Sequence, residues 1–305
     1  MKRSALSFAV AGSLLISGAA LGFNPGSGGG SGGANTCETN CGFERGPDPT
    51  LSGLRSGTGP YSVSTVDVPY GSAGFGGGTI HYPTNTSGGK MGAIAVIPGF
   101  VSPESSIGWW GPALASQGFV VLTMGTQTPL DSPSARARQL TAGLDHLVEQ
   151  SNSSSSAISG LVDPSRVAMV GWSMGGGGTL KNAAGDRLSA AIPLAPFDMD
   201  MSSYKNIETP TMILGCESDI IAAADLFAVP SYEHIPESTD KAYFEFAGQG
   251  HWCANGNNDN NELLSILGVS WMKRYLDKDT RYDQFLCGTN HSSNSAFSQV
   301  RDTCN

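Results

Sequence analysis

The feature that most constrains this chain is a short apolar run leading into a serine flanked by glycines. Residues Val167-Ala168-Met169-Val170 predict a buried strand, and the chain then reaches Ser173 within a G-x-S-x-G motif. Glycines two residues to either side allow a sharp turn from strand to helix, which exposes the hydroxyl and turns the next N–H toward a developing oxyanion. In a chain with 41 glycines the same motif also arises as a glycine-rich turn with an incidental serine. The interpretation of Ser173 as a nucleophile therefore depends on finding an acid and a base.

Apolar runs that predict strands alternate with segments of helical spacing along most of the chain. The expected strands are at residues 61–68, 79–83, 92–97, 119–123, 167–170, 190–194, 211–214 and 243–246. The expected helices are at residues 109–116, about 131–148, 220–227 and 263–275. Glycine-rich turns between the first two strands favour an antiparallel pair. The later alternation predicts an α/β domain over residues 45–305, with a mainly parallel central sheet and helices on both faces.

The N-terminal region predicts export. A basic start, Met1-Lys2-Arg3, precedes an apolar segment that ends in small residues, which predicts a signal peptide over residues 1–20. Residues 21–44 are predicted to be a Gly/Ser-rich linker with a small cysteine clip. We therefore expect a secreted protein, with a periplasmic location as the alternative, and six cysteines in an exported chain favour disulfides over metal sites.

Charge and composition narrow the classes of partner. The net charge is −9 and no basic stripe is present, which argues against nucleic acid as a ligand. The apolar segment at the N-terminus is too short and too rich in small residues for a membrane span, so we expect no membrane association once it is removed. We expect a monomer that acts on a neutral substrate or a solid surface, without a metal or cofactor.

An acid candidate follows the predicted strand at residues 211–214. A serine nucleophile needs a base within hydrogen-bond reach and a third group that fixes the tautomer of that base. In α/β enzymes whose nucleophile lies on such a strand-to-helix turn, the order is serine, acid, histidine, each in a loop after a strand. Asp219 lies a few residues beyond the strand and is the preferred acid, with Glu217 as the competitor. The alternative role for Asp219 is to cap the helix expected at 220–227.

Three histidines lie beyond Asp219, and His251 is the predicted base. It follows the strand at 243–246 through Ala247-Gly248-Gln249-Gly250, a flexible loop that can place an imidazole over the carboxyl edge of the sheet. His234 lies in a polar connection between two prolines, and His291 lies in an Asn/Ser-rich loop near the C-terminus. Position and order favour His251.

The cysteines provide a separate argument. Cys216 lies three residues before Asp219, and Cys253 lies two residues after His251. If these two groups and Ser173 meet, a Cys216–Cys253 disulfide would join the acid loop to the base loop. The other cysteines would then pair with their neighbours in the chain, Cys37 with Cys41 and Cys287 with Cys304. Sequence leaves the alternative pairings open.

Two backbone N–H groups are candidates for an oxyanion hole. One belongs to Met174, directly after the serine, and the other to Phe100, in the loop after the strand at 92–97. Large apolar side chains near these positions are expected to line a substrate trough: Phe100, Trp172, Met174, Phe197 and Trp252. Each also has a simpler role in packing, for Trp172 beneath the serine turn and for Phe197 at a strand end.

These residues resemble a known family. The segment at 171–178 (Gly-Trp-Ser-Met-Gly-Gly-Gly-Gly), with Arg45-Gly46-Pro47-Asp48-Pro49-Thr50 and Pro98-Gly99-Phe100, is similar to bacterial cutinases and poly(ethylene terephthalate) hydrolases from about Arg45 to the end. The resemblance implies an α/β-hydrolase fold without a lid that cleaves cutin-like and synthetic polyesters. Cys216, Cys253 and the Asn-rich stretch at 254–260 resemble the subgroup with an additional active-site disulfide and a longer loop after the histidine.

Three positions depart from the best-known member that cleaves poly(ethylene terephthalate). Phe100 replaces a tyrosine, Phe197 replaces a tryptophan that stacks on the aromatic ring, and Trp252 replaces a serine.

Taken with the predicted nucleophile, acid and base, the family resemblance leads us to expect a secreted serine esterase with a polyester substrate. The alternatives are an esterase for small soluble esters and, from another class, a non-catalytic surface-binding module.

Overall fold

The computed structural model describes residues 41–71, 73–86, 88–287 and 294–303. The predicted signal peptide and residues 21–40 of the predicted linker lie outside the described residues. The same holds for Cys37, His291 and Cys304. Cys41 and Cys287 are disulfide-bonded, but the pairings predicted for them involve residues outside this range and stay predictions.

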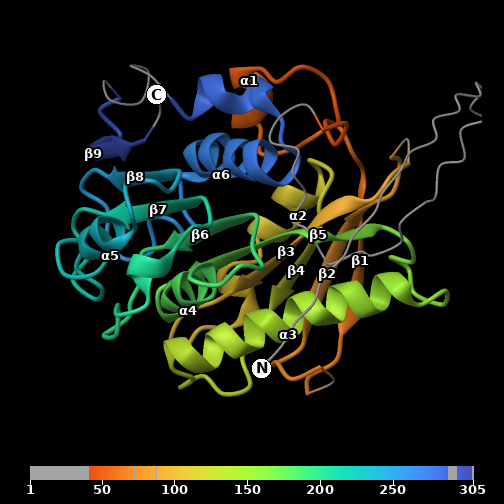
Figure 1. The fold of residues 1–305 in the computed structure, drawn as a ribbon, viewed down its shortest axis with the longest axis horizontal. Helices are drawn as coiled ribbons and strands as arrows, with labels where there is room; N and C mark the ends of the chain where they lie inside the picture. Colours follow the sequence, from red (N-terminus) through yellow and green to blue (C-terminus); the bar gives the residue numbers. More distant parts are fainter. Residues whose placement is uncertain (1–40, 72, 87, 288–293, 304–305) are drawn as a thin grey trace, which may run out of the picture. The chain divides into compact units, whose positions relative to one another are not determined.

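The strands of the described chain form one nine-stranded sheet in the order β1-β2-β4-β3-β5-β6-β7-β8-β9 (Figure 1). Their bounds are β1 Val63–Val68, β2 Gly78–Pro83, β3 Met91–Ile97, β4 Val120–Met124, β5 Val162–Trp172, β6 Ala190–Leu194, β7 Thr211–Cys216, β8 Lys241–Phe246 and β9 Phe297–Asp302. The six central strands, β4 to β8 in this order, pair in parallel. The edge strands β1, β2 and β9 pair antiparallel. The predicted α/β fold with a mainly parallel sheet is confirmed, as is the antiparallel β1–β2 pair.

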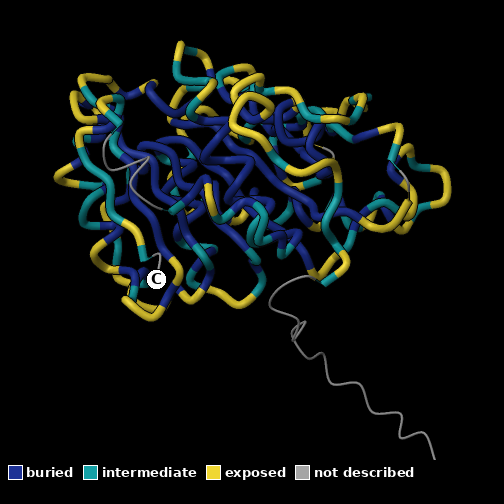
Figure 2. Tube along the Cα trace, turned by 90° about the horizontal axis from the view of Figure 1, so that it is seen from above, coloured by how far each residue is buried: buried dark blue, intermediate teal, exposed yellow. Residues whose placement is uncertain are grey.

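Helices cover both faces of the sheet. The α-helices are α1 Leu51–Arg55, α2 Trp110–Ala115, α3 Pro133–Asn152, α4 Met174–Ala183, α5 Ala228–His234 and α6 Asn261–Leu276, with 3-10 turns η1 Glu104–Ser106, η2 Tyr204–Asn206 and η3 Thr280–Phe285. α1, α2 and α6 pack together on one face, and α3 and α4 cover the other, with α5 against β7 and β8 (Figure 1). Strands β3, β4, β6 and β7 are buried along their whole length, as expected for strands with helices on both sides (Figure 2). Their carboxyl ends therefore share one edge, where the loops that bear functional groups emerge.

Strand β5 begins earlier than predicted. The structure starts it at Val162, five residues before the strand predicted at 167–170, and so includes Asp163-Pro164-Ser165. The pairing explains the difference, because Met91 pairs with Val162 and the register then shifts before Ala93 pairs with Val167. A local irregularity of this kind accommodates a proline within a strand.

The helix expected at residues 220–227 is absent from the structure, and a helix occurs instead at Ala228–His234. Its large apolar side chains Ile220, Ile221 and Leu226 are exposed, and only the small Ala222 and Ala224 are buried, so that segment lacks the large apolar face that would hold a helix against the sheet. His234 is therefore the last residue of α5 and not part of a polar connection.

The final strand, β9, was not predicted. Phe297–Asp302 carries a single buried residue, Phe297, and its other positions are partly or fully exposed. Such an edge strand lacks the continuous apolar run that identified the central strands. It pairs antiparallel with β8.

Candidate active site

Ser173 occupies a strained turn between β5 and α4. Its φ of 58° lies in a region that L-residues rarely adopt. Three backbone hydrogen bonds hold it there: Ser173 N–H donates to the carbonyl of Leu194 at 2.8 Å, and its own carbonyl accepts from Gly177 and Phe197 at 3.1 and 2.9 Å. The bonds to the loop after β6 fix the serine at the carboxyl edge of the sheet. Its side chain is buried, with 5% of the residue exposed.

The two glycines of the motif are required by close packing and not by their own backbone angles. A Cβ on Gly171 would lie 2.1 Å from the carbonyl oxygen of Gly175, and one on Gly175 would lie 2.7 Å from the carbonyl oxygens of Ile97 and Pro98. Neither glycine has a positive φ; the serine carries that conformation itself. The absence of side chains lets the first turn of α4 pack directly on β5 and on the end of β3.

Asp219 and His251 meet at Ser173 from the ends of β7 and β8. His251 Nε2 lies 2.9 Å from Ser173 Oγ, and His251 Nδ1 lies 2.6 Å from Asp219 Oδ2. The other carboxylate oxygen of Asp219 accepts hydrogen bonds from the backbone N–H groups of Ile221 and Ala222, both at 2.8 Å. Burial acts to raise the pKa of the Asp219 carboxyl, but the hydrogen bonds from His251 and the two backbone groups outweigh it and the pKa is lowered. An ionised Asp219 can only accept, so Nδ1 donates to it and Nε2 is left to accept from the serine hydroxyl.

The competing candidates lie elsewhere. Glu217 is exposed and accepts a hydrogen bond from the backbone N–H of Gly248 at 2.6 Å. The Nδ1 atom of His234 lies 2.7 Å from the carbonyl oxygen of Pro230, within its own helix. Glu217 therefore helps to shape the loop before His251, and neither group reaches the serine.

A cavity of about 420 Å³ opens over Ser173. Of the five side chains predicted to line a trough, Phe100, Trp172 and Trp252 line it. Phe100 and Trp252 are about half exposed, whereas Trp172 is almost fully buried. Phe197 and Met174 are not among the lining residues: the ring of Phe197 packs on that of Phe227, with centroids 4.6 Å apart.

Several lining residues were missed by sequence reasoning. They belong to the loop after β3 and to the segment after Asp219: Val101, Ser102, Pro103, Ser106 and Ile221. Val101 has a φ of 51°, unusual for a β-branched residue. Only its place one residue after Phe100 could have indicated a role.

The sequence of the whole described region matches known esterases. A family model described as PET hydrolase-like matches residues 37–305. This chain belongs to that family. Bis(hydroxyethyl) terephthalate hydrolase of Streptomyces coelicolor is 47% identical over 247 residues, which are 80% of this chain and 77% of that protein. Cutinase est2 of Thermobifida alba is 45% identical over 265 residues, 86% of this chain and 85% of the relative, and cutinase cut1 of Thermobifida fusca is 42% identical over 265 residues, 86% and 80%.

Membership in the PET hydrolase-like family confirms both the predicted class, a carboxylic ester hydrolase, and the family resemblance. Among the described residues, no helix combines the length and the apolar character that a membrane crossing needs. No group of three or more His, Cys, Asp or Glu side chains in the same residues could hold a metal ion.

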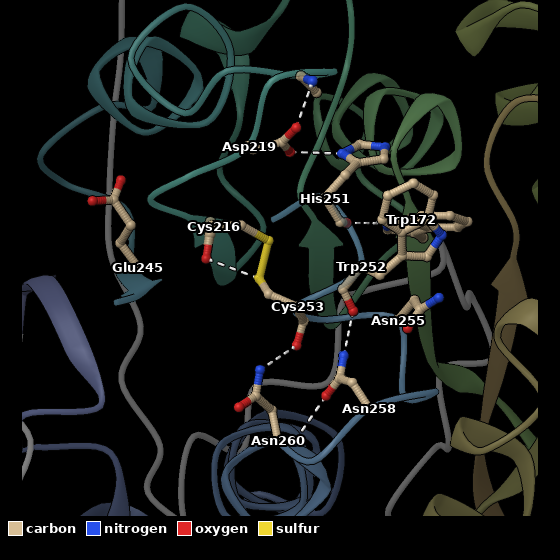
Figure 3. The surroundings of a disulfide bond; sticks show 12 residues. Trp172, Cys216, Asp219, Glu245, His251, Trp252, Cys253, Asn255, Asn258 and Asn260 are labelled. Carbon is tan, nitrogen blue, oxygen red and sulfur yellow. Dashed lines mark hydrogen bonds and ion pairs between the residues drawn. A yellow bond between two sulfur atoms is a disulfide. The ribbon is translucent and has the colours of Figure 1, made fainter. Parts of the chain in front are cut away.

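The predicted Cys216–Cys253 disulfide is present in this PET hydrolase-like chain, with Cα atoms 5.9 Å apart (Figure 3). It joins the end of β7 to the loop that carries His251. Side chains hold the same loop at successive carbonyl oxygens: Trp172 Nε1 donates to His251 at 2.9 Å, Asn258 donates to Trp252, and Asn260 donates to Cys253 at 3.0 Å. The loop that bears the histidine is therefore held by more than its covalent bond.

Replacing both cysteines, Cys216→Ala with Cys253→Ala, should lower the thermal midpoint while leaving kcat at 25 °C within about threefold of wild type. The closed loop spans a sequence separation of 37, for which chain entropy gives about 4 kcal/mol. At about 2–4 °C per kcal/mol for a domain of this size, the midpoint should fall by roughly 10 °C. Calorimetry and ester hydrolysis at 25 °C measure the two effects. An unchanged midpoint would refute the stabilising role, and a large loss of kcat in the folded variant would show that the hydrogen bonds alone do not position His251.

Proposed function

We propose that this protein hydrolyses carboxylic ester bonds of polyesters through an acyl-enzyme formed on Ser173. The observation that carries the proposal is the continuous chain of contacts from Ser173 Oγ to His251 Nε2, at 2.9 Å, and from His251 Nδ1 to Asp219, at 2.6 Å. Nucleophile, base and orienting acid in this geometry constitute the machinery of serine hydrolases.

The proposed reaction has two halves. Ser173 Oγ attacks the ester carbonyl carbon while His251 Nε2 takes its proton, and the carbonyl oxygen becomes an oxyanion. When the tetrahedral intermediate collapses, the carbon–alkoxide bond breaks and His251 returns the proton to the departing alcohol. His251 then takes a proton from water, which attacks the acyl carbon. When this second intermediate collapses, the bond between the acyl carbon and Ser173 Oγ breaks, His251 returns the proton to Oγ, and the acid leaves. Asp219 keeps the neutral imidazole in the required tautomer and stabilises the imidazolium that forms in each half.

The proposed oxyanion hole consists of the N–H groups of Phe100 and Met174. Met174 is the first residue of α4, where N–H groups have no partner within the helix. Phe100 lies in the loop after β3, and this loop is close to the serine, because a Cβ on Gly99 would lie 2.8 Å from Ser173 Cβ. Neither N–H donates to a protein acceptor in the described part of the chain. Both are thus available to an oxygen bound above Ser173.

An exposed apolar rim favours a polymer over a small soluble ester. Most of the large hydrophobic side chains exposed on the described chain lie in loops that follow the central parallel strands: Phe100, Val101, Leu130, Met199, Ile220, Ile221, Leu226 and Trp252. We call these eight residues the apolar rim. The connection from β6 to β7, all of which the structure describes, holds only the short turn η2, so no helical cap is inserted at this point. The names of two relatives, a bis(hydroxyethyl) terephthalate hydrolase and a cutinase, refer to a terephthalate ester and to the polyester cutin.

Polar replacement of two rim residues that do not line the cavity should separate polymer from soluble substrate. Met199 and Ile220 are 80% and 96% exposed, and covering them on an apolar film would remove much of that surface from water. In the double variant Met199→Ser with Ile220→Ser, product release from polyester film at subsaturating enzyme should fall about tenfold, the equivalent of about 1.4 kcal/mol of lost burial. Hydrolysis of p-nitrophenyl butyrate in solution should stay within about twofold, because the reacting groups are untouched.

Leu51→Ser is the matched control, since Leu51 is also exposed but belongs to α1 and lines a different cavity with Leu263 and Phe285. It should change neither rate. Equal losses on film and soluble ester in the double variant would contradict a role of the rim in polymer binding. Soluble-ester activity without any release from film by the wild-type protein would favour the alternative, an esterase for small esters.

We also propose that the protein is exported. The predicted signal peptide at residues 1–20 and the Cys216–Cys253 disulfide support this location, because disulfides persist in oxidising compartments.

A further inference from the structure

A buried arginine lies behind the site and takes no part in the proposed chemistry. Arg136, in the first turn of α3, is fully buried. Its guanidinium donates to three backbone carbonyl oxygens: Nη1 to Pro98 at 2.9 Å, Nε to Asp131 at 2.9 Å and Nη2 to Pro129 at 3.2 Å. Each of these acceptors is uncharged. The Asp131 carboxylate is bonded instead to Thr128 and Gln139.

Local structure gives no reason for a cation at this position. A positive charge in the first turn opposes the helix dipole. Burying a guanidinium among carbonyls also forfeits its hydration without gaining a hydrogen-bonded carboxylate in return. Burial lowers the pKa of Arg136 to about 10, opposed by the negative charge of Asp131, so the side chain stays protonated at neutral pH. The charge itself therefore does not explain this arginine, and its role follows from the three backbone carbonyls that its hydrogen bonds hold in place.

Those contacts bracket Phe100 on both sides. Before it, Arg136 holds the carbonyl of Pro98 directly. After it, the N–H of Val101 donates to the carbonyl of Pro129 at 2.9 Å, and this is the same carbonyl that Arg136 holds with Nη2. Val101 has a φ of 51°, a conformation that this loop would not keep without outside bonds. The backbone is therefore fixed on both sides of the Phe100 N–H, at Pro98 and at Val101, and both positions are linked by hydrogen bonds to the guanidinium of Arg136.

The carbonyl of Pro98 also touches the element that carries the other oxyanion donor. A Cβ on Gly175 would lie 2.7 Å from this oxygen, so the first turn of α4, which begins at Met174, packs directly on it. A Cβ on Gly178 would lie 2.9 Å from the backbone N of Ala137, so α4 packs equally closely on α3 next to Arg136. The Pro98 carbonyl oxygen therefore accepts a hydrogen bond from Arg136 and is also in close contact with the first turn of α4.

We propose that Arg136 is a positioning residue that sets the Phe100 N–H relative to the Met174 N–H in the oxyanion hole. The inference rests on the proposed function of the site and names a further residue for it. Only arginine presents several N–H donors in one rigid plane, as three carbonyls around a single point require. A lysine keeps the charge but cannot reproduce the fork.

The test compares Arg136→Met, which keeps the apolar stem and removes every donor, with Arg136→Lys. The matched control is Arg138→Met, two residues along the same helix, where the side chain is exposed and donates to Ser134 within the helix. Active sites are counted with a fluorophosphonate probe, so that kcat refers to folded and reactive enzyme only. The second readout is the inhibition constant of phenylboronic acid, which forms an anionic tetrahedral adduct with a reactive serine.

Arg136→Met should lower kcat for p-nitrophenyl butyrate about 10- to 100-fold with KM changed by less than about threefold. A displaced Phe100 N–H would stabilise the oxyanion of the transition state less well, whereas binding of the uncharged substrate depends little on it. The inhibition constant of the boronic acid should rise by a similar factor. Arg136→Lys should fall between Arg136→Met and wild type, and it carries the test if Arg136→Met does not fold. The Arg138→Met control should match wild type in both readouts.

Wild-type kcat and boronate affinity per labelled site in Arg136→Met or Arg136→Lys would overturn the inference and leave Arg136 a structural residue, even if the thermal midpoint falls. A fluorophosphonate probe that fails to label Ser173 in the wild-type protein would instead overturn the proposed function. The two failures are therefore distinguishable.

Discussion

Ser173→Ala is expected to lower kcat for p-nitrophenyl butyrate hydrolysis on the order of 10⁴-fold or more, because it removes the hydroxyl that is hydrogen-bonded to His251. The other serine hydroxyls that line the cavity, those of Ser102 and Ser106, donate to backbone carbonyls instead.

The fold should be unaffected. Alanine bears the same conformational cost as serine at a φ of 58°, and the backbone bonds of Ser173 to Leu194, Gly177 and Phe197 do not involve the hydroxyl. We therefore expect the thermal midpoint to stay within about 3 °C, which corresponds to about 1 kcal/mol.

The measurement is steady-state hydrolysis with purified variant, together with labelling by the fluorophosphonate probe and calorimetry. Ser218→Ala is the control, because Ser218 is an exposed serine adjacent to Asp219 at the same edge of the sheet. It should retain activity within about twofold. Residual activity of Ser173→Ala at a comparable rate, or a probe adduct on another residue, would sink the nucleophile assignment and with it the proposed mechanism.

Much of the fold could be predicted because the central strands are buried on both faces. Runs such as 92–97 and 211–214 contain almost no polar residue, and only strands between two layers of helix require that. Loops after consecutive parallel strands emerge at one edge, which explains why Ser173, Asp219 and His251, far apart in sequence, are close in the structure. The Cys216–Cys253 disulfide followed from the same topology.

The parts that could not be predicted depend on contacts between distant backbone groups. Arg136 donates to three backbone carbonyl oxygens. Every residue has such a carbonyl, so the residue type does not indicate which ones accept these hydrogen bonds. The packing of Phe197 on Phe227 depends on the conformation of two loops, and the residue pattern of a loop does not predict its conformation. The segment at 220–227 has a helical composition, but its isoleucines face solvent, and local propensity could not show that.

The steric role of the glycines was also beyond sequence reasoning. Turn chemistry assigns glycine to positive φ, yet Ser173 itself takes that conformation in this chain. Gly171 and Gly175 are instead needed because backbone oxygens lie where their Cβ atoms would be. A motif can thus be recognised correctly while the physical reason for two of its residues is different from the expected one.

Asp219→Asn is expected to lower kcat about 10³- to 10⁴-fold with little change in KM, because the amide can satisfy only part of what the carboxylate does. Asp219 accepts from His251 on one oxygen and from the N–H groups of Ile221 and Ala222 on the other. In asparagine the single amide oxygen stays with the two backbone donors, and the NH₂ group then faces His251 Nδ1. Nδ1 becomes an acceptor, the proton moves to Nε2, and the imidazole can no longer accept the proton of Ser173.

Glu217→Gln tests the competing acid under the same conditions, since this side chain accepts from Gly248 N–H and an amide oxygen can replace it in that bond. Its kcat should remain within about twofold of wild type. Hydrolysis of p-nitrophenyl butyrate by both variants, with active sites counted by the fluorophosphonate probe, measures the difference. A large loss in Glu217→Gln combined with a small one in Asp219→Asn would transfer the role of the acid to Glu217. The 2.6 Å contact between Asp219 and His251 Nδ1 would then be a structural one. The opposite result is expected because a carboxylate orients the base only from hydrogen-bond distance, and in this site that carboxylate belongs to Asp219.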